Sequence, residues 1–283
     1  METLTVDLLH RVITKRPENS HKGTFGHIVI VGGSAQYGGA VMMCAKSCIY
    51  SGAGLVSVAT DPHNHAALHA QLPEAMVLDW QDQSLLFNQI KAADVVVIGP
   101  GMGTDPLEQT RLLEILARQE QQLFVIDGSA ITMLAKTPYA FNYPERVVFT
   151  PHQKEWERLS KLPIDQQTDQ LNKHCQEQMN STVVVKSHRT TIYSPTKDYQ
   201  NPLGNPGMAT GGMGDTLAGI IGSFLAQFSH VPLSERVAAA VLIHSYIGDQ
   251  LAKTQYVVLP TAITASLPET MKFFSENEAF SAF

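Results

Sequence analysis

Short apolar runs, rich in β-branched residues, alternate along the chain with segments that could form helices. Several runs, such as 27–31 and 94–99, are continuously apolar, which is typical of strands covered on both faces. The alternation predicts βαβ units and a mainly parallel sheet. The predicted strands are 27–31, 55–59, 75–78, 94–99, 123–127, 146–150, 182–186 and 190–193, with helices at roughly 39–51, 106–119, 128–136, 152–160 and 165–180.

After residue 200 the alternation gives way to long helical segments, at about 214–227, 234–253 and 262–275. No proline- or serine-rich linker, charged run or internal repeat separates the chain into halves. We therefore expect one domain over residues 1–283, because an α/β fold can exceed about 250 residues without splitting. The expected architecture is α/β, with a central mainly parallel sheet of about eight or more strands and helices on both faces.

The charge balance disfavours polyanionic macromolecules as partners. The chain has 20 Lys+Arg against 26 Asp+Glu, a formal net charge of −6, so it offers no basic footprint for nucleic acid or an anionic membrane. The apolar stretches are too short to cross a membrane, and Glu2 and Asp7 interrupt any secretory signal. With only 3 cysteines, a disulfide framework is not expected. These features predict a cytoplasmic protein.

Eighteen of the 20 glycines fall in three windows, at 23–54, 99–103 and 204–222. Glycine lets a ligand approach the backbone closely, so such clustering suggests specialised loops. In a parallel sheet, ligands bind beyond the carboxyl ends of the strands. The candidates that follow predicted strands are 32–39, 99–103, Asp127, His152 and Lys186.

The first two windows are open to two interpretations. The segment GGSAQYGGA, which follows strand 27–31, satisfies neither the dinucleotide fingerprint nor the phosphate-loop motif, because Gly39 stands where the phosphate loop has lysine. It is either a ligand-facing loop or a tight strand-to-helix connection. The same choice applies to IGPGMG at 98–103, where Asp105 and Pro106 are placed to begin the next helix.

The third window, NPGMATGGMGD, directly precedes an apolar helix. Backbone N–H groups of Gly211, Gly212, Met213 and Gly214 can converge at the positive end of that helix and form an anion hole. Asp215 follows in the first turn. It is either a helix cap or a general base that takes a proton from a hydroxyl while the loop stabilises a phosphoryl group in transfer.

Further candidates have ordinary alternatives. His152 and Glu155 follow strand 146–150, where His152 could equally be a surface histidine. Lys186 ends a strand and either pairs with phosphate or is a solvated turn lysine. The group His63, His65 and His69 resembles a metal site but lacks cysteine or carboxylate partners at suitable spacing, so we do not expect a metal there.

Taken in order, the motifs resemble those of the ADP- or ATP-dependent NAD(P)H-hydrate dehydratases of the ribokinase-like superfamily. The resemblance covers about residues 20–275, and its elements are KGTFGHIVIVGGSAQYGGA, SGAGLVSVAT, IGPGMG, FVIDGSAI, FTPHQKEWERL, VVVKSHRT and GNPGMATGGMGDTLAGIIG. It implies phosphorylation of the ring hydroxyl of the S epimer of NADH or NADPH hydrate, followed by phosphate elimination that restores NAD(P)H. The implied cofactor is Mg²⁺, with ADP or ATP as co-substrate.

The resemblance also implies roles for single residues. Asp215 would be the catalytic base and a hydrate contact, and Gly214 a nucleotide contact beside it. Glu155 matches a glutamate that organises magnesium in related kinases. The implied hydrate-binding residues are Ala40, Gly101 or Gly103, and His152, and the implied adenine-nucleotide residues are Lys186, Ser187, His188, Arg189 and Thr190.

The resemblance further suggests a homo-oligomer, a tetramer, and a separate epimerase, because about 20 residues before the match cannot hold an epimerase domain. Two other functions remain open. The same fold serves kinases of small alcohols such as vitamin precursors, although His152 stands where those kinases commonly have asparagine. A protein that only binds adenine nucleotide would need no base at Asp215.

Overall fold

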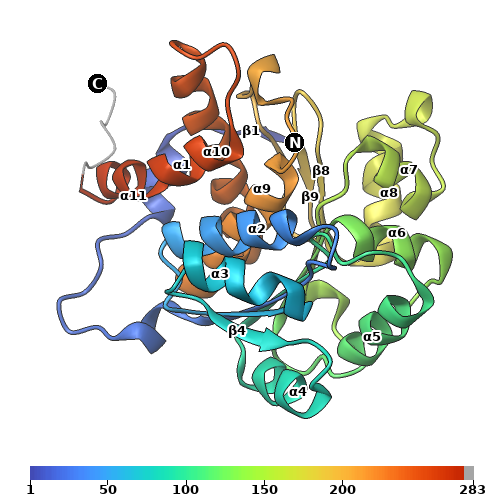
Figure 1. Cartoon of the computed structure of the whole chain (residues 1–283). Coiled ribbons are helices and arrows are strands. Elements are labelled where there is room, and N and C mark those ends of the chain that lie inside the picture. Colours follow the sequence, from blue (N-terminus) through green and yellow to red (C-terminus); the bar gives the residue numbers. More distant parts are fainter. Residues whose placement is uncertain (277–283) are drawn as a thin grey trace, which may run out of the picture.

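The computed structural model describes residues 1–276 and contains one ten-stranded sheet with helices on both faces (Figure 1). The strands are β1 (Glu2–Thr3), β2 (His27–Val31), β3 (Leu55–Thr60), β4 (Met76–Asp79), β5 (Val95–Ile98), β6 (Leu123–Ile126), β7 (Val147–Phe149), β8 (Thr182–Val185), β9 (Thr191–Tyr193) and β10 (Tyr199–Gln200). The α-helices are α1 (Asp7–Val12), α2 (Gly38–Tyr50), α3 (His65–Gln71), α4 (Gln83–Ala92), α5 (Pro106–Leu116), α6 (Gly128–Lys136), α7 (Gln153–Ser160), α8 (Asp169–Met179), α9 (Met213–Gln227), α10 (Leu233–Ala252) and α11 (Pro260–Glu276).

The strand order is β1-β10-β9-β8-β7-β6-β5-β2-β3-β4. All neighbouring strands are parallel except at β9, which is antiparallel to both β8 and β10. From β2 the chain first builds outward through β3 to β4, and then returns to β5 on the other side of β2. The strand order therefore reverses between β2 and β5, which is where a ligand crevice forms in open α/β sheets.

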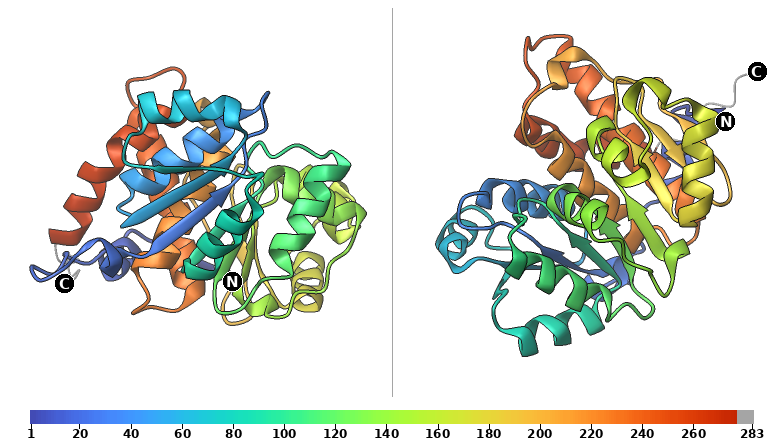
Figure 2. Two further views of the ribbon diagram at one scale, coloured as in Figure 1. Left: turned by 60° about the horizontal axis from the view of Figure 1, so that its bottom comes forward. Right: turned by 90° about the vertical axis from the view of Figure 1, so that its right-hand side faces the viewer.

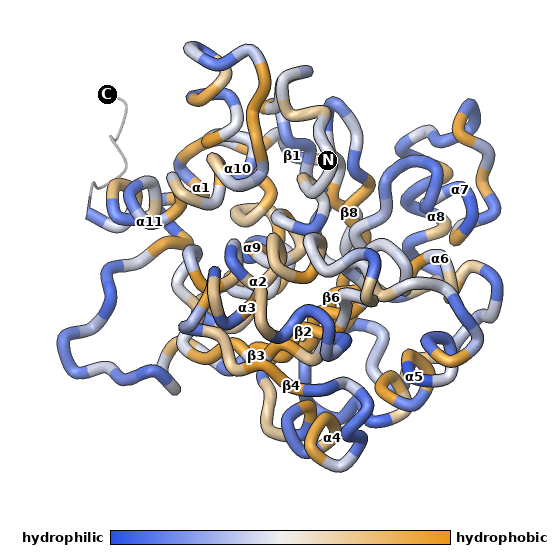
Figure 3. The backbone as a smooth tube through the Cα atoms, viewed as in Figure 1, coloured by the Kyte–Doolittle hydropathy of each residue, from blue (hydrophilic) through white to orange (hydrophobic). Residues whose placement is uncertain are grey.

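Two hydrophobic cores pack against the two faces of the sheet, because alternate strand residues point to opposite sides. One core joins Ile28, Ile30 and Val97 to α1, α2, α9, α10 and α11, and the other joins Val29, Val31 and Ile98 to α4, α5 and α6. Figure 2 shows these two layers on either side of the strands, and Figure 3 shows hydrophobic strands at the centre of a more polar periphery. Double burial explains why these strands are continuously apolar in sequence.

The predicted mainly parallel α/β sheet and all eight predicted strands are confirmed, as are the predicted helices, with shifts of a few residues at their ends. The prediction missed the two-residue strands β1 and β10 and the helices α1, α3 and α4. No helix within residues 1–276 combines the length and the apolar composition required to cross a bilayer.

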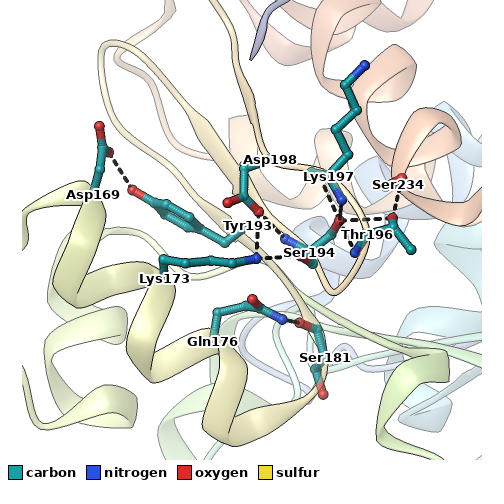
Figure 4. Close-up of polar contacts among 10 residues, drawn as sticks. All are labelled: Asp169, Lys173, Gln176, Ser181, Tyr193, Ser194, Thr196, Lys197, Asp198 and Ser234. Atoms are coloured by element: carbon teal, nitrogen blue, oxygen red, sulfur yellow. Dashed lines mark hydrogen bonds and ion pairs between the residues drawn. The ribbon is translucent and has the colours of Figure 1, made fainter. Parts of the chain in front are cut away.

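The antiparallel edge of the sheet is anchored to α8 by polar contacts (Figure 4). The Tyr193 hydroxyl donates to Asp169 Oδ1 at 2.7 Å, and Lys173 Nζ lies 3.0 Å from Asp198 Oδ1. Asp198 also accepts the Ser194 backbone N–H at 2.9 Å. This network therefore holds the end of β9 and the connection from β9 to β10 against α8.

Candidate active site

The loops after β2 and β5 are joined to one another at the point where the strand order reverses. Gly33 N donates to Pro100 O at 2.8 Å, and Ser34 N donates to Gly101 O at 2.7 Å. A Cβ at Gly32 would lie only 2.1 Å from Pro100 O, so this close approach of the two backbones requires glycine. The first two glycine windows therefore form one wall at the carboxyl ends of the strands.

This wall brings together the predicted hydrate-binding residues Ala40 and Gly101. Gly101 has φ +61°, and a Cβ placed on it would lie 2.9 Å from Ala40 Cβ. Gly103 follows with φ +90°, and its N–H donates to Ser129 Oγ at 3.1 Å. Both glycines adopt a left-handed conformation that side chains disfavour, and only Gly101 lies beside Ala40, since Gly103 faces Ser34 and Glu108.

The third window spans the N-terminus of α9. Gly212 is the N-cap residue with φ +96°, and a Cβ there would lie 2.3 Å from Met43 Sδ. Gly211 has open space around its Cα. The first N–H groups of α9, including those of Met213 and Gly214, have no partners within the helix and carry its positive end. Asp215 stands in the first turn but is not the cap, so its capping interpretation is wrong.

Lys186 reaches from the end of β8 to this helix end. Its Nζ lies 2.9 Å from Asp127 Oδ1 and 3.0 Å from the position of a Cβ on Gly214. Asp127, which is 2% exposed, also accepts the Thr150 hydroxyl at 2.6 Å. A cation is thereby held against the backbone of the proposed anion hole by a buried carboxylate, which favours the phosphate-pairing interpretation of Lys186 over a solvated turn lysine.

The charges in this group shift one another's pKa values. Burial raises the pKa of Asp215 to about 6, the negative charge of Asp127 adds to the rise, and Lys186 opposes it. Burial alone would lower the pKa of Lys186, but the negative charges of Asp127 and Glu155 outweigh it, and the pKa is raised. At neutral pH the site therefore holds a charged lysine beside a mostly ionised carboxylate whose pKa lies close to the working pH of a general base.

His152 and Glu155 form a reciprocal cap on α7, with the His152 side chain 53% exposed. The imidazole Nδ1 accepts the backbone N–H groups of Lys154 and Glu155, and Glu155 Oε2 accepts the His152 N–H at 2.9 Å. Burial and the nearby Lys186 lower the pKa of His152, so its ring is neutral at pH 7. Burial raises the pKa of Glu155, whose side chain is 8% exposed.

The predicted nucleotide residues line one cavity of about 580 Å³. Lys186, Ser187, His188, Arg189, Thr190 and Gly214 all contribute to its wall. Within the loop, Ser187 Oγ accepts the Arg189 N–H at 3.1 Å and donates to the Arg189 carbonyl at 2.7 Å, which holds the turn in shape. The remaining wall is largely apolar, with Leu203, Met208, Met213, Leu217 and Val241.

Sequence reasoning missed several residues of this site, namely Thr150, Asn205 and His244. His244 had a visible signal, a histidine within an otherwise apolar helix. Thr150 and Asn205 are ordinary polar residues in sequence. Among residues 1–276 no group of three or more histidine, cysteine or acidic side chains is placed to bind a metal, and His63 instead pairs with Asp61 at 2.7 Å.

Comparison with known proteins agrees with this site. A family model described as NAD(P)H-hydrate dehydratase matches residues 28–269. A protein of Enterococcus faecalis named ADP-dependent (S)-NAD(P)H-hydrate dehydratase is 54% identical over 98% of this chain and 94% of its own length. A protein of the same name from Lactiplantibacillus plantarum is 48% identical over 98% of this chain and 99% of its own length.

A solved structure tests the fold directly. The structure of a ribokinase-like superfamily protein from Enterococcus faecalis superposes with a TM-score of 0.95 at 53% identity, over 98% of this chain and 97% of that chain. The ribokinase-like fold expected from the ordered motifs is confirmed. By the family model and these full-length relatives, the chain belongs to the NAD(P)H-hydrate dehydratase family.

Proposed function

We propose that the protein dehydrates the S epimer of NADH or NADPH hydrate at the expense of ADP, yielding NAD(P)H, phosphate and AMP. The observation that carries this proposal is Asp215, a carboxylate with a pKa of about 6. It lies in the first turn of α9, the helix whose N-terminus faces Lys186. The names of the full-length relatives support the same substrate and nucleotide.

In the first step Asp215 takes the proton of the ring hydroxyl. The hydroxyl oxygen then forms a bond to the terminal phosphorus of ADP, and the bond from that phosphorus to the bridging oxygen breaks to release AMP. Lys186 and the N–H groups at the start of α9 are placed to stabilise the charge that develops on the phosphoryl oxygens.

In the second step the phosphate ester leaves. The carbon–oxygen bond breaks with its electron pair on the departing phosphate, a neighbouring ring carbon loses a proton, and the double bond of the dihydronicotinamide returns. Phosphorylation is needed because hydroxide is a poor leaving group and phosphate is a good one. Ala40, Gly101, Gly103 and the neutral His152 would hold the hydrate ring against Asp215 during both steps.

The chain's own donors fit a Mg²⁺ ion that is held mainly through the nucleotide phosphates, since this ion needs only one or two protein carboxylates. Glu155 is the residue that would hold it, directly or through water. Burial raises the pKa of its carboxylate, the charge of Lys186 opposes that rise, and its cap contact uses only Oε2. When bound, the ion would neutralise charge on the phosphate oxygens.

Asp215→Asn tests the proposal directly. The amide cannot accept the hydroxyl proton, so we expect ADP-dependent recovery of NADH absorbance from NADH hydrate to fall by about 10²–10⁴-fold while ADP binding and thermal stability remain. The assay is run with ADP or ATP, with Mg²⁺ or a chelator. Full activity of the variant would remove the assigned base, and a stable phosphorylated product without NADH would instead indicate a kinase.

We infer the working context from the same family membership. The protein would act in the cytoplasm, as a homotetramer, with a separate epimerase that supplies the S epimer from the R epimer. Light scattering of the purified protein tests the assembly, and an equal mixture of the two hydrate epimers tests the need for an epimerase. Without an added epimerase we expect only the S half of the mixture to be consumed, and rapid consumption of the whole mixture would contradict the need for one.

A further inference from the structure

Two residues that line the cavity beside loop 186–190 each carry a buried polar atom that no residue within 1–276 satisfies. These atoms are His244 Nε2, on α10, and Asn205 Oδ1, on the segment before α9. A buried polar atom without a partner costs free energy, so a native structure that keeps two of them on residues lining one cavity calls for an explanation. Neither residue has a role in the phosphoryl-transfer chemistry described above.

His244 is 6% exposed, and it lies in a wall otherwise made by Leu203, Leu217 and Val241. Its neighbour Ser245 is already engaged, because its hydroxyl accepts the Asn201 amide at 2.8 Å. Burial, with a smaller effect of the Lys186 charge, lowers the pKa of His244 to about 4. The ring is therefore neutral at physiological pH and suits a neutral polar group better than a phosphate.

The orientation of Asn205 is fixed by its other neighbours. Its Nδ2 donates to Asp249 Oδ1 at 2.8 Å, while Asp249 Oδ2 accepts the Gly204 N–H at 3.1 Å. Since Asp249 can only accept, the amide nitrogen of Asn205 must face it. The amide oxygen is thereby left without a donor, buried 2.9 Å from the position of a Cβ on Gly207.

The lining of the cavity thus combines apolar side chains with a neutral histidine and an asparagine of fixed orientation, together with Lys186 and Gly214. Apolar walls with a few placed polar groups are typical of a site for a flat heterocycle. We propose that His244 Nε2 and Asn205 Oδ1 hydrogen-bond the purine base of the nucleotide, with Asn205 Oδ1 accepting from the exocyclic amino group of adenine. This inference rests on the proposed use of ADP and names the residues that select its base.

His244→Phe tests the first contact. Phenylalanine keeps a ring of similar shape and removes the nitrogens, so we expect the Kd and the KM for ADP to rise by about 3- to 10-fold while kcat and the KM for the hydrate stay unchanged. The melting temperature without ligand should stay the same or rise, because an unsatisfied buried nitrogen has been removed, while the shift caused by ADP becomes smaller. A role of His244 in packing alone would instead lower the melting temperature and leave ADP affinity unchanged, which would overturn the proposal.

His65→Phe is the matched control. His65 Nε2 is also buried without a partner among residues 1–276, but His65 does not line this cavity, so its variant should bind ADP as the parent does. The Asn205 contact is tested with inosine diphosphate, whose oxygen replaces the amino group. The parent should prefer ADP and Asn205→Ala should lose most of that preference, whereas equal affinity of the parent for the two nucleotides would overturn this contact.

These outcomes are distinguishable from failure of the proposed function. A parent protein that binds no ADP and recovers no NADH would contradict the dehydratase assignment itself. A parent that does both, with ADP affinity unchanged in His244→Phe, would contradict only the base-recognition role.

Discussion

At the scale of single residues, Asp127 connects the charged groups of the site. It is buried at the end of β6, holds Lys186 Nζ at 2.9 Å and adds to the raised pKa of Asp215. One carboxylate thus both positions the cation for the phosphate and makes the base a better proton acceptor at neutral pH. Its own contact with substrate is not required for either effect, so it acts as a positioning residue.

The pH dependence of the reaction should report this coupling. If ionised Asp215 is the base, kcat/KM falls as the pH drops below about 6, the pKa of that carboxyl, and approaches a tenfold loss per pH unit. Asp127→Asn removes a negative charge that raises this pKa and leaves Lys186 less neutralised, so both effects move the acid limb to lower pH. Rate profiles of parent and variant from pH 5 to pH 8 measure the shift, and an acid limb that stays in place would exclude Asp127 from this role.

Some residues of the site could be predicted from the sequence and others could not. Asp215, Lys186 and the glycines were visible because their types and spacing are unusual next to predicted strand and helix ends. Thr150 and Asn205 were not, since their importance depends on one long-range contact each, to Asp127 and Asp249, and no local pattern encodes such contacts. His152 was anticipated, but its cap with Glu155 depends on where α7 begins, which a pattern predicts only to within a few residues.

At the scale of elements, the position of the anion hole depends on how α9 packs on α2. A Cβ at Gly219 would lie 2.1 Å from Cys44 O and 2.2 Å from Ser47 Oγ, so glycine is what allows the two helices to approach this closely. Ser47 Oγ also donates to the carbonyl of Thr216, the residue after Asp215, at 2.9 Å. The helix that carries the base is thereby held against the helix that follows the first glycine loop.

Gly219→Ala should separate these helices. The methyl group would overlap backbone and hydroxyl atoms that cannot both move, so we expect a loss of about 2–3 kcal/mol in the free energy of unfolding and a lower kcat, because the start of α9 shifts relative to the hydrate wall. Denaturant unfolding and the NADH-recovery assay measure the two effects. Gly39→Ala on α2 is the control for stability, since nothing lies within 4 Å of its added methyl group, and a similar loss there would contradict the packing argument.

Four of the five elements that the sequence analysis missed, all except the ten-residue α4, share a physical reason. Strands β1 and β10 have two residues each, and α1 and α3 have 6 and 7, so none is long enough to show a clear hydrophobic period. They form because the large sheet and its helices already offer an edge or a face to pack on. The long buried strands and α9 and α10, by contrast, carry enough apolar residues to be recognised locally.

At the scale of the whole molecule, the site is assembled across the sheet. The hydrate wall comes from the loops after β2 and β5, the lysine from β8, and the base from α9, and all of them meet at the carboxyl ends of parallel strands. Both cores run along the sheet, the first from Ile28 to Val184 and the second from Val29 to Val185. We therefore propose that the chain is one domain, as its continuous alternation predicted.

Calorimetry tests whether the chain unfolds as one domain. Because the ligand site draws on distant strands of one sheet, the chain should unfold in a single cooperative transition, and ADP should move all of it. At a concentration about 100 times its Kd, ADP stabilises the native state by about 2.7 kcal/mol, which corresponds to a rise of roughly 5–10 °C in a chain of this size. Two domains would behave differently, since only the one that binds ADP would shift and the other transition would stay in place. Asp215→Asn should keep the ADP-induced shift in melting temperature while losing turnover. This comparison distinguishes ADP binding, which stabilises the whole chain, from the proton transfer that requires the Asp215 carboxylate.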